Sequence, residues 1–124
     1  MLVAHSQGTM VFRRALEFLS PQTKAMIEFY GNGGQTFIPN DIGLKKAENY
    51  MQANDPVARL NWSVGKKVRE AKGHTYDVYS IGRGGEGNAP NVGAHGWVDN
   101  YQQLYQNPKG VTRPQGTTRL QYPP

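Results

Sequence analysis

The chain contains no cysteine and no long run of apolar residues. The absence of cysteine excludes disulfide scaffolds, zinc sites built on cysteine and thiol catalysis, and it leaves the redox compartment undetermined. No apolar stretch approaches the ~20 residues that a membrane-spanning helix needs. The N-terminus also lacks the basic-then-apolar order of a signal peptide. We therefore predict a soluble chain with no transmembrane segment and no signal peptide, of unknown location.

Acidic residues are few, since 9 Asp and Glu stand against 14 Lys and Arg and give a net charge of +5. Such an excess raises the question of a nucleic-acid surface. Three basic residues, Lys109, Arg113 and Arg119, lie in a C-terminal stretch without acids, and the mixed run 66–72 is typical of a solvated helix face or turn. We predict no specific nucleic-acid partner. Salt-dependent anion binding through the tail stays open as an alternative.

The 124 residues, 37% of them hydrophobic, are enough for one domain with a modest core or for part of a larger one. Apolar spacing predicts an alternation of strands and helices. The predicted strands are 1–4, 26–30 and 75–81. The predicted helices are 9–19, with Val11, Ala15, Phe18 and Leu19 on its buried face, and a polar surface helix over 42–52.

A glycine-rich loop is predicted over 82–90, followed by an amphipathic helix that begins after His95 and buries Trp97, Tyr101, Leu104 and Tyr105. The stretch 107–124 is rich in proline and poor in apolar residues, which predicts a disordered basic tail. The fold class predicted is therefore α/β, with about three parallel strands, flanking helices and a disordered C-terminal tail.

Residues 4–8, Ala-His-Ser-Gln-Gly, stand where the first strand turns into the first helix. A strand-to-helix elbow strains its central residue and lifts the serine oxygen toward solvent. Small residues at positions 4 and 8 let strand and helix approach closely, although the commonest form of the motif has glycine at both. The N–H of Gln7 would face a substrate oxyanion at the positive end of the helix. The alternative is a serine that only caps a helix.

Three segments resemble the α/β-hydrolase family, in its lipase- and esterase-like form. Residues 3–9 resemble the nucleophile elbow around Ser6, and residues 54–60, Asn-Asp-Pro-Val-Ala-Arg-Leu, are similar to the stretch that carries the acid, here Asp55. Residues 93–97, Gly-Ala-His-Gly-Trp, resemble the segment of the final histidine, here His95. The order Ser, Asp, His is that of the family. The resemblance favours His95 over His74 as the base, because the family's base follows the last strand.

The resemblance implies a serine hydrolase of small-molecule or lipid esters. Ser6 would attack the acyl carbon, His95 would move the proton and Asp55 would orient His95, with Gln7 in the oxyanion hole. No cofactor is expected. No metal is expected either, since the three histidines lack ligand spacing, and the glycine-rich stretch 82–87 matches neither a P-loop nor a dinucleotide fingerprint.

Residues 1–106 correspond to the second half of that family's domain, because several strands precede the elbow in a complete member. An elbow strand at the sheet edge predicts self-association. The chain is therefore expected to be a serine hydrolase or the C-terminal portion of one. The alternative is a catalytically inactive remnant, or an interaction module of a larger bacterial surface or toxin protein.

Overall fold

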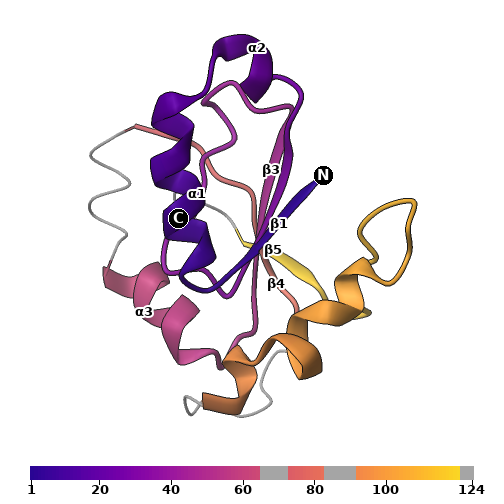
Figure 1. The fold of residues 1–124 in the computed structure, drawn as a ribbon. Helices are drawn as coiled ribbons and strands as arrows, with labels where there is room; N and C mark the ends of the chain where they lie inside the picture. The colour runs from indigo at the N-terminus through magenta and orange to yellow at the C-terminus, as the bar shows by residue number, and fades with distance from the viewer. Residues whose placement is uncertain (65–72, 83–91, 121–124) are drawn as a thin grey trace.

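The computed structural model describes residues 1–64, 73–82 and 92–120. Their strands form one five-stranded sheet in the order β1-β2-β3-β4-β5, in which β1 to β4 run parallel and β5 is antiparallel to β4 (Figure 1). This mostly parallel sheet with flanking helices confirms the α/β class and extends the expected three parallel strands to four. The strands are β1 (Leu2–His5), β2 (Glu28–Asn32), β3 (Lys46–Met51), β4 (Val78–Ser80) and β5 (Thr118–Leu120).

Helices and helical turns lie on both sides of this sheet. No helix in the described ranges is long and apolar enough to cross a bilayer. The elements are α1 (Gly8–Ala15), the 3-10 turn η1 (Leu16–Phe18), α2 (Pro21–Lys24) and α3 (Pro56–Val64). They continue with η2 (Val92–His95), the π-helical turn η3 (Trp97–Tyr101) and η4 (Gln102–Tyr105).

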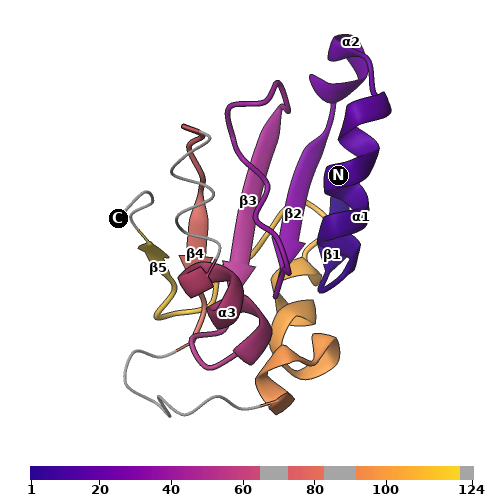
Figure 2. The ribbon, with the colours of Figure 1, turned by 90° about the vertical axis from the view of Figure 1, so that its left-hand side faces the viewer.

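The alternation of side chains along β1 assigns the two faces of the sheet. Leu2 and Ala4 pack with α1 in one apolar cluster, whereas Val3 packs on the opposite face with residues of η3 and η4. In Figure 2 the arrowheads of β2 and β3 point to the end of the sheet where α3 and the segment 92–105 lie. The carboxyl ends of the parallel strands are therefore surrounded by α3 and η2 to η4.

The buried face of the first helix differs from the predicted one. Phe12 and Leu16 are buried, and the Phe12 ring stacks on Phe29 of β2 at 4.3 Å between centroids. Val11 and Phe18, which were expected inside, are 65% and 78% exposed. The helix has apolar residues on two sides, and periodicity alone could not decide which side meets the sheet. The structure places the side with Phe12 and Leu16 against the sheet, in one cluster with Phe29 and Ile38.

The prediction of a surface helix over 42–52 is wrong, because residues 46–51 form the central strand β3. Polar residues misled the prediction, since Glu48 and Asn49 are buried in this strand. The Asn49 amide donates to the carbonyl oxygen of Ile38 at 3.0 Å, and its oxygen accepts from the N–H of Ile38 at 2.9 Å. Buried polar side chains are tolerated where they are hydrogen-bonded in this way.

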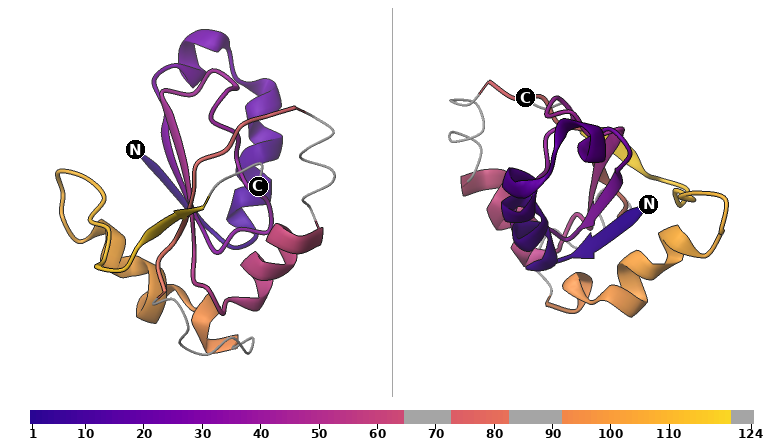
Figure 3. Two further views of the ribbon diagram at one scale, coloured as in Figure 1. Left: turned by 180° about the vertical axis from the view of Figure 1, so that it is seen from behind. Right: turned by 45° about the horizontal axis from the view of Figure 1, so that its top comes forward.

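The tail predicted to be disordered is ordered over 107–120. It returns along the sheet and adds β5 beside β4, as the orange-to-yellow trace in Figure 3 shows. Arg113 stacks over the ring of Tyr79 at 4.2 Å, and Leu120 packs against an apolar cluster under the sheet. Composition predicted disorder because it contains no information about strand-pairing partners that lie far away in the sequence. Residues 121–124 lie outside the described part.

The other predicted elements are present with shifted ends. The helix predicted over 9–19 is formed by α1 and η1. The strand predicted from residue 26 begins at Glu28, and the strand predicted over 75–81 is reduced to Val78–Ser80. The helix predicted after His95 is formed by η3 and η4, where Tyr101 and Leu104 are fully buried. Helix α3, over 56–64, was not predicted. Residues 83–90 of the glycine-rich loop predicted over 82–90, and the basic run 66–72, lie outside the described residues.

Candidate functional site

Ser6 occupies a strained turn between β1 and α1. Its φ angle is 54°, which makes it the one non-glycine residue with positive φ in the described ranges. The turn is held by the Ser6 N–H, which donates to the Asn32 carbonyl at 3.0 Å, and by Thr9, whose hydroxyl donates to the Ser6 carbonyl at 2.8 Å. A Cβ on Gly8 would lie 3.6 Å from that of Ala4, in van der Waals contact, so strand and helix approach closely here.

Gln7 follows at the N-cap of α1, with φ −60° and ψ −25°. Its backbone N–H belongs to the first turn of the helix, where amide groups have no partner within the helix. The side chain of Gln7 is exposed and makes no capping hydrogen bond. Position 7 thus adds a backbone donor beside Ser6 at the positive end of the helix.

His95 lies between Ser6 and Asp55, which are far apart in sequence. Its Nε2 is 2.7 Å from Ser6 Oγ, and its Nδ1 is 2.9 Å from Asp55 Oδ2 and 3.0 Å from Asp55 Oδ1. The His95 side chain is 19% exposed and that of Asp55 is fully buried. The three residues singled out in the sequence are thus one hydrogen-bonded chain at the carboxyl ends of the strands.

Asp55 is a buried carboxylate with several donors around it. The backbone N–H groups of Val57 and Ala58, at the start of α3, donate to Oδ1 at 2.9 and 3.3 Å. The hydroxyl of Tyr101 donates to Oδ2 at 2.6 Å. A buried carboxylate requires such compensation, because removing it from water is costly. The segment 54–58 therefore does more than form a turn, since it fixes the carboxylate in one orientation.

Gly33 allows the three side chains to meet. A Cβ at this position would lie 2.7 Å from Asp55 Oδ2, 3.0 Å from the Tyr101 hydroxyl and 3.1 Å from His95 Nδ1, and its φ is +55°. Only glycine fits both the conformation and the space. Sequence reasoning missed Gly33 as part of the site. The signal that could have found it is the Gly-Asn-Gly-Gly run at 31–34, directly after the predicted second strand.

His5, the residue before Ser6, contacts the segment that carries His95. Its Nε2 is 2.7 Å from the carbonyl oxygen of His95, and the two rings lie 4.9 Å apart. Burial lowers the pKa of His5, opposed by the hydrogen bond to the His95 backbone. At neutral pH His5 is therefore uncharged, and its Nε2–H donates a hydrogen bond to that carbonyl oxygen. His5 thereby ties β1 to η2.

His74 lies away from this group. Its Nδ1 contacts Asp41 Oδ1 at 3.0 Å, and the same carboxyl accepts from the N–H of Thr75 at 3.1 Å, so this pair joins two surface loops. The preference for His95 over His74 as the partner of Ser6 agrees with this placement. Over the described ranges, no three His, Asp or Glu side chains are grouped so as to hold a metal ion.

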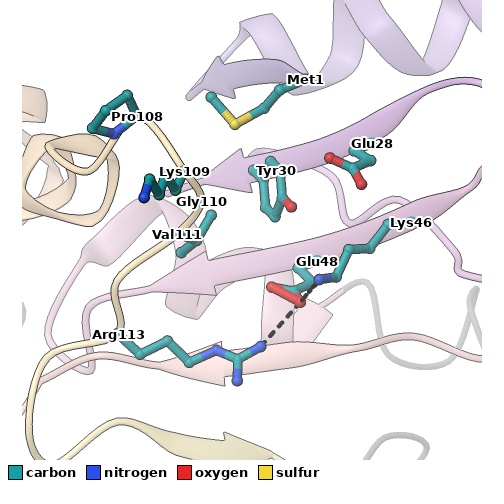
Figure 4. Close-up of a pocket in the computed structure, with 10 residues that line it drawn as sticks. All are labelled: Met1, Glu28, Tyr30, Lys46, Glu48, Pro108, Lys109, Gly110, Val111 and Arg113. Carbon is teal, nitrogen blue, oxygen red and sulfur yellow. Dashed lines mark hydrogen bonds and ion pairs between the residues drawn. The ribbon is translucent and has the colours of Figure 1, made fainter.

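A second polar cluster lies over one face of the sheet, along β2 and β3, in a pocket of about 630 Å³ (Figure 4). Its central residue is Glu48, which is 4% exposed and accepts from Arg113 at 2.9 Å and from the hydroxyl of Tyr50. Lys46 Nζ lies 3.4 Å from the same carboxylate, which raises the pKa of Lys46. Because these groups satisfy one another, the cluster anchors the returning tail to the sheet.

Comparisons with protein-family models, curated proteins and solved structures give no match to this chain. The functional argument accordingly depends on the geometry of the group formed by Ser6, His95 and Asp55.

Proposed function

We propose that the protein is a serine hydrolase that cleaves acyl esters of small molecules or lipids, with the site organised as in α/β-hydrolases. The observation that carries the proposal is the 2.7 Å contact between His95 Nε2 and Ser6 Oγ, with Nδ1 of the same ring on the buried Asp55. A hydroxyl that faces a base, with that base oriented by a carboxylate, is the arrangement that activates a serine nucleophile.

Each group has one role in the proposed reaction. Ser6 Oγ attacks the acyl carbon while His95 Nε2 accepts its proton, and the negative charge that develops on the carbonyl oxygen faces the N–H of Gln7. His95 then returns the proton to the leaving alkoxide, so an alcohol departs and an acyl-Ser6 remains. Water, deprotonated by His95, attacks this ester; the acyl–Oγ bond breaks, His95 gives the proton to Ser6 Oγ, and the acid is released. Asp55 stabilises the imidazolium at both steps without taking up a proton.

Labelling with a fluorophosphonate tests whether Ser6 is activated. We expect intact-mass measurement to show one adduct on the wild type and none on Ser6→Ala, because phosphonylation requires an activated hydroxyl. His95→Gln should slow labelling by at least about 10²-fold, since the general base is lost. Hydrolysis of p-nitrophenyl acetate and butyrate, followed by absorbance, should be lost in the same two variants.

Ser20→Ala is the matched control, because Ser20 Oγ bonds only to Thr23 at the cap of α2, accepting from its N–H at 3.1 Å and donating to its hydroxyl at 2.9 Å. This variant should label as the wild type does. A folded wild-type protein, verified by circular dichroism, that forms no adduct would exclude the proposed hydrolase activity for this chain.

A further inference from the structure

The hydroxyl of Tyr101 lies between the two ends of the segment that carries Asp55. It accepts from the N–H of Gln52 at 3.0 Å and donates to Asp55 Oδ2 at 2.6 Å. The Tyr101 side chain is fully buried, and its ring lies 5.6 Å from that of His5. A side chain of η3 is thus part of the hydrogen-bonded group at the ends of β1 and β3.

The direction of these hydrogen bonds follows from the donors available. The N–H of Gln52 only donates, so the tyrosine oxygen is the acceptor there and its single proton points to Asp55. Burial and the charge of Asp55 raise the pKa of Tyr101, so the hydroxyl keeps its proton at neutral pH and donates a hydrogen bond to Asp55.

A donor on Oδ2 affects how strongly Asp55 attracts the ring of His95. Oδ2 is also the oxygen nearest to His95 Nδ1, at 2.9 Å. The titratable groups that face His95 are Asp55 before α3, His5 on β1 and Tyr101 on η3. Because His5 is uncharged at neutral pH, the balance between Asp55 and Tyr101 sets how firmly the imidazolium is held.

We propose that Tyr101 is a positioning residue that fixes the Asp55 carboxylate and lowers the affinity of His95 for a proton. This inference rests on the proposed function, in which His95 must be neutral to accept the proton of Ser6. Without the tyrosine hydroxyl, more of the Asp55 charge acts on His95 and favours the imidazolium. The pH below which the nucleophile is inactive then moves upward.

Tyr101→Phe tests the proposal, because it removes the hydroxyl and keeps the ring. The titration of the His95 ring protons is followed by NMR between pH 4 and 9 in the full chain. We expect the midpoint in Tyr101→Phe to lie about 0.5–1 pH unit above that of the wild type, the shift that corresponds to one ordinary hydrogen bond. The pH dependence of the fluorophosphonate labelling rate should shift by the same amount.

Tyr105→Phe is the matched control. The hydroxyl of Tyr105 lies on the neighbouring turn η4 and donates to Asn32 Oδ1 at 2.7 Å instead of to Asp55. Tyr105→Phe should leave the midpoint of the His95 titration unchanged. An unchanged or lowered midpoint in folded Tyr101→Phe would overturn the proposal, as would an equal shift in Tyr105→Phe. A shifted midpoint in a protein that forms no adduct would reject the hydrolase and keep the role of Tyr101.

Discussion

At the scale of single residues, the site depends on two positions with unusual backbone conformations. Ser6 has a φ of 54° and Gly33 has a φ of +55°. A serine in the left-handed region costs of order 1–3 kcal/mol and persists only where the surrounding structure enforces it. Here the enforcing contacts are those with Asn32 and Thr9. The strained residue, Ser6, is the one whose Oγ faces His95. Strained backbone conformations tend to cluster at functional sites.

We predict that Gly33→Ala disrupts the site. The new methyl group would lie 2.7 Å from Asp55 Oδ2 and 3.1 Å from His95 Nδ1, and one of these groups must move. Because a shift of about 1 Å in a catalytic group costs on the order of 10²-fold in rate, labelling of Ser6 should slow by that factor. Intact-mass measurement of the labelling rate checks this.

Gly43→Ala separates collision from backbone strain. Gly43 also has a positive φ, +90°, but a Cβ there meets nothing within 4 Å. This control should lose about 1 kcal/mol of unfolding free energy and label at the wild-type rate. Equal labelling rates in the two variants would show that Gly33 leaves room for a side chain.

At the scale of elements, β3 and the C-terminal tail stabilise each other. Glu48 in the centre of β3 is almost fully buried, and Arg113 of the tail supplies a cation at 2.9 Å. Arg113 also donates through Nε to the hydroxyl of Tyr50 at 3.1 Å. A buried carboxylate needs such partners, because an unpaired one costs several kcal/mol. The pairing explains why a polar segment forms a central strand and why the tail is ordered.

Arg113→Met should therefore lower the free energy of unfolding by about 1–3 kcal/mol in urea denaturation. The loss stays moderate because Lys46 remains near Glu48 and the Arg113 side chain is 44% exposed. In Glu48→Gln/Arg113→Met the loss should be smaller than the sum of the two single changes, since no unpaired charge is left.

Arg119→Met is the control in the same tail. Its partner is Asp77, at 2.5 Å, and the Arg119 side chain is 67% exposed, so its removal should cost less than about 1 kcal/mol. Strict additivity in the double variant at positions 48 and 113 would show that the two residues do not interact energetically.

At the scale of the whole molecule, one side is apolar and unpaired over the described residues. β1 is the first strand of the sheet and pairs only with β2 there. One side of α1 faces the segment that follows β2, where Thr36 borders Met10, Arg13 and Glu17. Val11 and Ala15, four residues apart on α1, are exposed on one side of this helix. An open strand edge beside exposed apolar side chains is a template for association.

We expect the protein to associate with a second copy of itself through this side. Sedimentation velocity should show a weight-average mass that rises above 13.8 kDa with concentration. Val11→Lys should reduce this rise, because Val11 is 65% exposed on the apolar side of α1. Met26→Lys, at a residue 72% exposed beyond α2, is the matched control and should leave it unchanged. A single monomeric species at all concentrations would contradict the expectation.

From the sequence we singled out Ser6, Asp55 and His95, three residues that the structure joins in one hydrogen-bonded chain. Ser6 stands between a strand and a helix, and strand-to-helix turns are recognisable from local spacing and small residues. Asp55 and His95 were selected by resemblance to a family, and the structure places them within 3.0 Å of each other. The expected α/β class also followed from local patterns, since alternating strands and helices favour a parallel sheet.

Other features depended on contacts between residues far apart in the chain. Lys46–Met51 is a strand because it pairs with β2 on one side and β4 on the other, and its buried Glu48 has its partner in Arg113, 65 residues later. The buried side of α1 is the one that packs on Phe29 of β2, and the tail is ordered where β5 pairs with β4. The proximity of Gly33 and Tyr101 to Asp55 likewise exists only in the folded chain. Local spacing encodes turns and elements, whereas the partners of buried polar groups are determined by the tertiary structure.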